Sequence, residues 1–193
     1  MKPTFVGHPV ETALFIATLV VWIGIEIPRA LNTRSDAKQV DQGSLNFLRL
    51  CAVVAAVGAA LVVRVPATAM PQGPVTFGIG IAVAWAGIGL RWWSFRTLGR
   101  YFTFTVQTSA DQPVITSGPY RFVRHPSYTG MMLALIGVGS TYGNWLSMAM
   151  FAVVLLVGFV NRIQVEEAAL SATLGGAYTS YASGRKRLVP LVW

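Results

Sequence analysis

The chain has 193 residues, of which 54% are hydrophobic and 11% are charged, and its formal net charge is +8. Soluble domains carry about 25% charged residues, so this composition excludes an ordinary soluble domain, and its hydrophobicity excludes intrinsic disorder. The basic residues flank long apolar runs, as topology signals and lipid-headgroup contacts do, so we expect an integral membrane protein that binds no nucleic acid.

The first half of the chain contains three apolar runs. Val10 to Ile27 has no basic leader and no small-residue cleavage pattern, which favours a retained helix over a signal peptide. The polar stretch 29–44 is expected to be a loop before the second run, Leu45 to Val65. Three prolines in 66–74 predict a short connection to the third run, Val75 to Phe95. Small residues in the third run are typical of close helix packing in lipid: Gly78, Gly80, Gly87 and Gly89.

The second half begins with about thirty residues, 96–126, that contain no run long enough to span a bilayer. The apolar segment Tyr128 to Tyr142 would be only about 22 Å long as a helix. Gly143-Asn144 predicts a turn, and Trp145 to Val165 predicts a further helix, so these two segments form a helical hairpin whose first arm enters from the interface. An amphipathic helix should follow, because apolar residues recur there at helical spacing: Leu170, Leu174, Tyr178 and Tyr181.

The predicted fold is therefore an all-α integral membrane protein with about five transmembrane helices. Lysine and arginine gather in 29–38, in 96–124 and in the tail, whereas 66–74 and 139–147 contain neither. By the positive-inside rule, the N-terminus lies outside, and both polar regions and the tail face the cytoplasm.

Two groups of ionisable residues stand out near this cytoplasmic side. His125 lies between Arg124 and Pro126, and because a residue before proline is restricted to extended backbone, its imidazole should sit at the mouth of the next helix. Arg162 and Glu166 are four residues apart and share a helix face. Local physics leaves two interpretations open: an interfacial basic loop with a surface ion pair, or a functional site, which ionisable groups near a bilayer core often mark.

Together these residues resemble the isoprenylcysteine carboxyl methyltransferase family, which groups with the phospholipid methyltransferases. The resemblance covers roughly residues 105–193. Its ordered set is Gly118 and Tyr120, then Arg124-His125-Pro126-Ser127-Tyr128, then Arg162 with Glu166-Glu167 and Leu170, then Gly175/Gly176, Tyr178, Tyr181 and a basic run before Pro190. The stretch between Gln107 and Gln112 is shorter than in eukaryotic members.

The resemblance implies an S-adenosylmethionine-dependent methyltransferase in which residues 1–95 form N-terminal helices and residues 96–193 form the catalytic region, as one integrated domain. It implies no metal. The implied catalytic residues are Arg162, Glu166 and His125, with Arg162 facing the methyl acceptor. The implied cofactor-binding residues are Gln107, Gln112, Pro113, Val114, Ile115, Tyr120, His125, Pro126, Ser127, Tyr128 and Glu166.

The expected reaction is carboxyl methylation of an isoprenoid or prenylcysteine-like acid that enters from the bilayer, in a membrane that we expect to be a prokaryotic inner membrane. A carboxylate is already ionised at neutral pH and needs no general base. Three alternatives remain open: a phospholipid N-methyltransferase, in which His125 could act as base, a membrane reductase, and a small lipid-binding membrane protein without catalytic activity.

Overall fold

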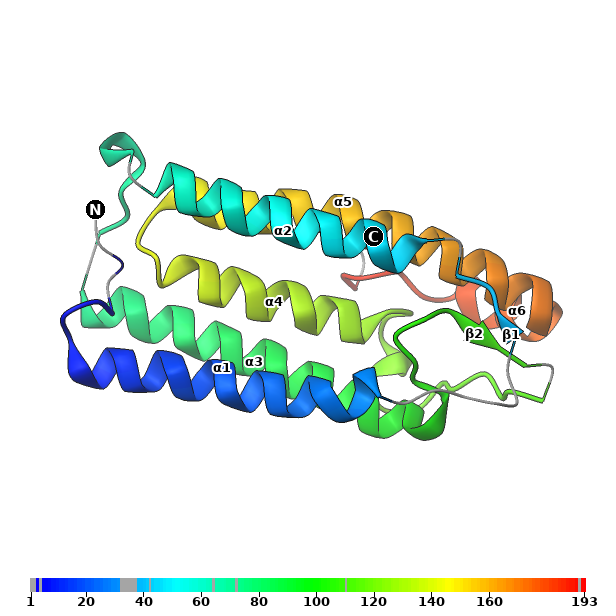
Figure 1. Ribbon diagram of the computed structural model, residues 1–193. Coiled ribbons are helices and arrows are strands. Elements are labelled where there is room, and N and C mark those ends of the chain that lie inside the picture. Colours follow the sequence, from blue (N-terminus) through cyan, green and yellow to red (C-terminus); the bar gives the residue numbers. More distant parts are fainter. Residues whose placement is uncertain are drawn as a thin grey trace.

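The computed structural model describes residues 3, 5–31, 38–41, 43–63, 65–71, 73–109, 111–190 and 192–193, and the chain forms a bundle of long helices (Figure 1). Much of the predicted 29–44 loop lies outside the described residues, and so does Arg34, one of the basic residues in 29–38 that support the predicted topology. The long helices are α1 (Pro9–Ala30), α2 (Ser44–Val62), α3 (Pro74–Leu98), α4 (Pro126–Ser140) and α5 (Trp145–Leu174).

Shorter elements complete the described chain. They are β1 (Lys38–Gln39), β2 (Gln107–Thr108), α6 (Gly176–Ser183) and three 3₁₀ helices, η1 (Pro66–Thr68), η2 (Gly99–Tyr101) and η3 (Gly118–Arg121). β1 and β2 pair antiparallel, with Gln39 opposite Gln107.

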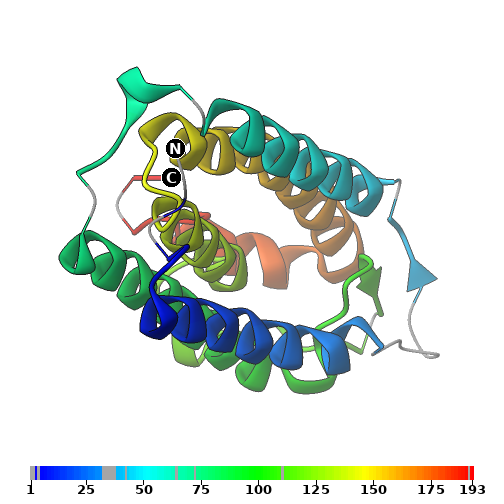
Figure 2. The same cartoon turned by 60° about the vertical axis from the view of Figure 1, so that its left-hand side comes forward.

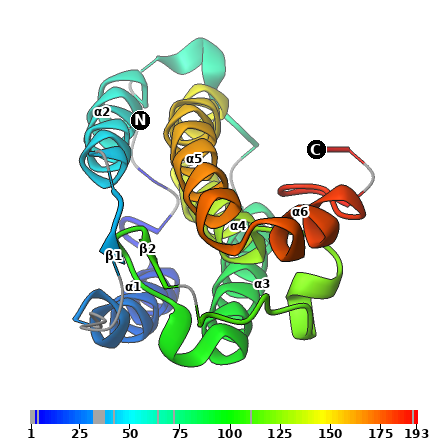
Figure 3. The same cartoon turned by 90° about the vertical axis from the view of Figure 1, so that its right-hand side faces the viewer.

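The helices pack in the spatial order α1, α3, α4, α5, α2. An end-on view shows this row as an arc, with the β1–β2 pair lying between α2 and α1 (Figure 3). A side view shows the same curved arrangement from another angle (Figure 2). Consecutive helices α1 and α2 therefore stand at opposite ends of the row. Between them in the sequence, β1 pairs with β2 at the end of the bundle where α3 ends and α4 begins.

Four helices are long and apolar enough to cross a membrane, namely α1, α2, the helix from Pro74 to Tyr101, and α5. Their apolar side chains are largely on the outside, for example Leu14, Val20 and Ile23 on α1. The prediction of an all-α membrane protein is confirmed. The 15-residue α4 is not among the four, so the predicted count of about five spans stays a prediction.

The predicted hairpin is present. Gly143 adopts a φ of +69°, and the Asn144 side chain caps α5 by accepting a hydrogen bond from the Ser147 amide. The prediction was wrong about where α5 ends, because the helix continues past Val165 and Glu166 to Leu174. It stops at Gly175, whose φ of +55° a residue with a side chain rarely adopts.

A seam of small residues joins α3 to α4. Gly87 on α3 faces Gly130 and Ala134 on α4, and a methyl group added to Gly87 would lie 2.5 Å from the Gly130 carbonyl oxygen. Gly137 on α4 faces Gly80 and Ala84 one step further along. The two backbones therefore touch, which fixes the start of α4 relative to the end of α3.

Candidate functional site

A pocket enclosing about 850 Å³, part of it open to solvent, lies at the end of the bundle where α3 ends and α4 begins. Its walls come from the segment after α3, from η3, from the first turn of α4, from the last turns of α5 and from α6. Its apolar lining includes Leu98, Phe102, Val106, Leu170 and Leu174. The site is thus assembled from elements separated by more than seventy residues.

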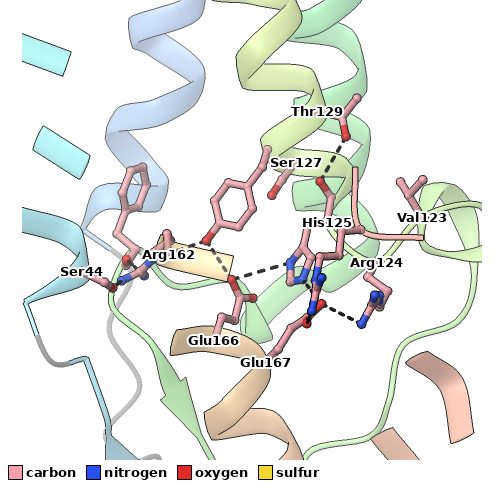
Figure 4. A network of polar contacts seen from close by, with 12 residues as sticks. Ser44, Val123, Arg124, His125, Ser127, Thr129, Arg162, Glu166 and Glu167 are labelled. Atoms are coloured by element: carbon pink, nitrogen blue, oxygen red, sulfur yellow. Dashed lines mark hydrogen bonds and ion pairs between the residues drawn. The ribbon is translucent and has the colours of Figure 1, made fainter. Parts of the chain in front are cut away.

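His125 is buried between two consecutive carboxylates of α5 (Figure 4). Its Nε2 lies 3.1 Å from Glu167 Oε1 and its Nδ1 lies 3.8 Å from Glu166 Oε2. Two arginines complete the coordination of Glu167, with Arg124 Nη1 and Arg187 Nη2 each 2.9 Å from it. Because both of its oxygens are engaged, Glu167 ties the His125 loop to α5 rather than facing the pocket.

The C-terminal segment holds this loop in place through its backbone. The amides of Arg124 and His125 donate to the carbonyl oxygens of Lys186 and Arg187 at 2.8 and 2.9 Å, and Thr129 Oγ1 donates to the Leu188 carbonyl at 2.7 Å. These bonds explain a correction to the sequence analysis. His125 caps α4 with φ −126° and ψ 58°, which is not the extended backbone expected before a proline.

Tyr128 and Glu166 form the polar centre of the pocket. The Tyr128 hydroxyl donates to Glu166 Oε2 at 2.8 Å, and the Tyr128 ring stacks against that of His125 with centroids 5.6 Å apart. The Glu166 side chain retains 30% of its exposure. Glu166 therefore offers negative charge, beside an aromatic face, to whatever occupies the pocket.

Arg162 is 3% exposed, and its partners come from three other segments of the chain. Its Nη1 pairs with the Asp41 carboxylate and donates to Ser44 Oγ at 2.7 Å. Its Nη2 donates to the Phe104 carbonyl, and its Nε lies 3.4 Å from the Tyr128 hydroxyl. The salt bridge of Arg162 is thus with Asp41 and not with Glu166, the partner that the four-residue spacing allowed. The guanidinium instead ties Asp41 and the start of α2 to α5.

Charge and burial set the state of several groups around the pocket. Burial alone would raise the pKa of Asp41, but hydrogen bonds from Arg162 and Ser44 hold it below its ordinary value. Burial raises the pKa of the Tyr120 phenol well above its usual range, and it raises the pKa of Tyr181 to about 12. Both phenols are neutral at physiological pH, and Tyr181 donates to the Tyr120 carbonyl at 2.8 Å.

A second buried ion pair lies next to the pocket, between α3 and α1. Arg91 on α3 pairs with Glu26 on α1, and its Nη1 donates to the Ser127 carbonyl at 3.1 Å in the first turn of α4. The Arg91 guanidinium also lies over the Phe95 ring, 4.6 Å from its centroid. The Arg91 side chain therefore links α1, α3 and α4 next to the site.

The structure brings eleven of the twelve predicted site residues to the pocket wall. These are Gln107, Gln112, Pro113, Val114, Ile115, Tyr120, His125, Ser127, Tyr128, Arg162 and Glu166. Pro126 is buried as the first residue of α4 and does not line it. Sequence reasoning missed Asp41 and Ser44, whose only signal was a polar loop beside a helix start.

Comparisons with known proteins bear on the same region. The profile of the isoprenylcysteine carboxyl methyltransferase family matches residues 79–172, which includes the α3–α4 seam, His125, Arg162 and Glu166. Over this region the chain is similar to the isoprenylcysteine carboxyl methyltransferase family.

Two similar curated proteins come from a yeast and a plant. The chain is 34% identical over 96 residues to a protein-S-isoprenylcysteine O-methyltransferase of Schizosaccharomyces pombe, covering 49% of this chain and 41% of that one. It is 33% identical over 115 residues to protein-S-isoprenylcysteine O-methyltransferase B of Arabidopsis thaliana, covering 58% of each. The chain thus spans about half the length of the curated relatives it matches.

The fold agrees with a solved member of the family. A structure of the eukaryotic intramembrane Ras methyltransferase, an isoprenylcysteine carboxyl methyltransferase, superimposes with a TM-score of 0.63 at 28% sequence identity. The superposition covers 75% of this chain and 52% of the other.

Proposed function

We propose that this protein is a membrane-embedded carboxyl methyltransferase that uses S-adenosylmethionine and acts on a lipophilic acid of the prenylcysteine kind. The observation that carries the proposal is the placement of Glu166, Tyr128 and Arg162 on one pocket wall, at the end of a membrane bundle. The names of the relatives support the reaction class, since they describe O-methylation of isoprenylcysteine.

The residues of the pocket fit the proposed cofactor chemically. S-adenosylmethionine supplies an electrophilic methyl group on a positively charged sulfonium sulfur. A carboxylate and an aromatic face both stabilise such a cation, and Glu166 and Tyr128 present them side by side. The strip from Gln112 to Ile115 lines the pocket outside any helix or strand, and its backbone groups are proposed to bind a heterocycle edge.

Arg162 is proposed to hold the acceptor carboxylate. Its contacts with described residues use Nε, both hydrogens of Nη1 and one of Nη2, which leaves one Nη2 hydrogen for an acceptor oxygen. A carboxylate is ionised at neutral pH, so the chain needs to orient and partly dehydrate it rather than deprotonate it. His125, engaged with Glu167, positions Tyr128 and Glu166.

The acceptor is proposed to reach the pocket from the bilayer, so that its apolar tail remains in lipid. We also propose that the pocket end faces the cytoplasm of a prokaryotic inner membrane. The support is the asymmetry of basic residues: Arg96, Arg100, Arg121 and Arg124 lie at the pocket end, whereas 66–74 and 139–147 contain no lysine or arginine.

Methyl transfer from labelled S-adenosylmethionine by the purified full chain tests the proposal. We expect a base-labile methyl ester on a farnesylated cysteine with a free carboxyl group and no labelling of phosphatidylethanolamine. Arg162→Lys keeps the charge but loses the planar fork, and should lower turnover at least about tenfold while cofactor affinity changes only a few fold.

The matched control is Arg49→Lys, because Arg49 lies on α2 and contacts only Asn46 among the described residues. This variant should retain full activity. Labelling of the amine lipid alone would contradict the carboxyl assignment, and absence of transfer to both acceptors by folded protein would contradict the enzymatic proposal. Full activity of Arg162→Lys would remove Arg162 from acceptor binding.

A further inference from the structure

Two buried polar atoms in the described part of the chain have no hydrogen-bond partner, Arg124 Nε and Tyr178 Oη. Both residues line the pocket, Arg124 from the loop before α4 and Tyr178 from α6. Tyr178 is only 5% exposed. Buried polar atoms are nearly always hydrogen-bonded in native proteins, so two such atoms in one pocket indicate that a ligand supplies their partner.

The surroundings of these atoms are otherwise satisfied. Arg124 uses Nη1 for Glu167 and its amide for the Lys186 carbonyl. Tyr181, three residues after Tyr178 on α6, donates its hydroxyl to the Tyr120 carbonyl. The two orphaned atoms are therefore not part of a generally loose region, and both belong to residues that line the pocket.

Both atoms are hydrogen-bond donors in the state they hold. An arginine Nε–H can only donate. Burial raises the pKa of the Tyr178 phenol above its ordinary value, and the nearby Glu167 and Glu166 carboxylates raise it further, so this phenol is neutral and carries a hydrogen. A pair of donors, one of them on a cation, recognises an anionic oxygen group such as a carboxylate.

The pocket therefore presents negative charge and hydrogen-bond donors from different side chains. Glu166 presents negative charge beside Tyr128, whereas Arg124 and Tyr178 present donors from the other elements. A zwitterionic amino-acid group attached to a sulfonium complements this division, because it carries positive and negative charges at separate atoms.

We infer that Arg124 Nε and Tyr178 Oη together bind a carboxylate of the pocket ligand, and that the amino-acid end of S-adenosylmethionine supplies it. The inference rests on the proposed function and adds to it two binding residues and the group they recognise. The acceptor's own carboxylate is the other source of the same chemistry, and the experiment below separates the two.

The test compares two cofactor forms that differ only in this carboxylate, S-adenosylmethionine and decarboxylated S-adenosylmethionine. Their affinities for the detergent-purified full chain are measured by calorimetry without any acceptor present. Tyr178→Phe should weaken S-adenosylmethionine binding about tenfold, as expected for a lost hydrogen bond to a charged group, and leave the decarboxylated form unchanged. Arg124→Lys keeps a positive charge for Glu167 and should show the same selective loss.

Two further variants sharpen the comparison. The double variant should lose less than the product of the single losses, because both side chains contact one group. Tyr142→Phe removes a hydroxyl at the opposite end of the bundle, where Tyr142 packs against Phe5 and Phe15, and should leave both affinities unchanged. As a control for folding, we expect Tyr178→Phe and the parent chain to have equal thermal stability.

Each other outcome overturns the inference. If Tyr178→Phe weakens both cofactor forms equally, or neither, the side chain does not bind a cofactor carboxylate. If cofactor affinity is unchanged and the KM for a carboxylate acceptor rises, the group belongs to the acceptor. If the parent chain binds neither form, the proposed function itself fails, which distinguishes that failure from the failure of this inference alone.

Discussion

Replacing Gly87 with alanine tests the seam that fixes the start of α4. A Cβ at this position would lie 2.5 Å from the Gly130 carbonyl oxygen and 2.9 Å from the Leu133 carbonyl carbon. The Ala134 amide nitrogen would be closer still. Ordinary contact begins near 3.4 Å, so the two helices must separate by at least about 0.9 Å, and because all three contacts are backbone atoms no side-chain rotation relieves them. Overpacking of this kind costs about 1–3 kcal/mol.

Gly89→Ala is the matched control, since it lies on the same helix with nothing within 4 Å of the added Cβ. Alanine is a better helix former than glycine by about 1 kcal/mol, so this control should be neutral or stabilising. The two variants should therefore differ by about 1–4 kcal/mol. Thermal unfolding in detergent should show Gly87→Ala melting roughly 2–16 °C lower than Gly89→Ala, on the scale of about 2–4 °C per kcal/mol for a chain of this size. Coincident melting curves would refute the backbone contact between α3 and α4.

Three further predictions concern charges. Glu26→Gln should destabilise the bundle by about 3 kcal/mol, because it leaves the Arg91 guanidinium buried without its carboxylate. Adding Arg91→Met to this variant should restore part of the lost melting temperature. No recovery in the double variant would contradict the pairing. Asp41→Asn should lower stability at pH 7. Since the pKa of Asp41 is depressed in the fold, the parent chain's advantage is fully present above the unfolded pKa of about 3.9 and is lost as the pH falls through the still lower folded pKa; a gap in melting temperature that does not narrow as the pH is lowered from 6 toward 2 would refute this. A cysteine in place of Lys186 should react with an impermeant thiol reagent only after cells are opened, with the buried Cys51 remaining silent, and labelling in intact cells would reverse the proposed orientation.

The helices could be predicted because apolar runs are local signals. The pocket residues between Gln112 and Tyr128 were predicted through the resemblance to a family, whose motif residues lie here in one contiguous stretch. The sequence could not reveal that Arg162 pairs with Asp41, since a polar residue in a loop has the same appearance whether it is solvated or buried against a guanidinium more than a hundred residues away. Only the packing of α2 against α5 brings the two together.

The basic run near the C-terminus illustrates a different limit. Its composition indicated a topology signal, whereas the structure uses its backbone: the carbonyls of Lys186 and Arg187 bind the amides of the His125 loop. Backbone hydrogen bonds hardly depend on residue type. Composition therefore reveals the charge of this segment but not its hydrogen bonds to the His125 loop. The same reasoning explains the end of α5, where Glu166-Glu167 reads as a helix end but lies within a continuous helix that only Gly175 stops.

The length of α5 determines the depth at which the proposed chemistry takes place. Thirty residues give a helix of about 45 Å, about 15 Å longer than the hydrocarbon core. Counted from Trp145, Arg162 lies about 26 Å along the axis and Glu166 about 32 Å, on either side of the boundary between hydrocarbon and water. A lipid acid whose head reaches this plane keeps its tail in hydrocarbon throughout. Moving a fifteen-carbon tail from lipid into water would cost about 12 kcal/mol at about 0.8 kcal/mol per carbon. Because the site lies at this depth, the acceptor can react without moving its tail into water.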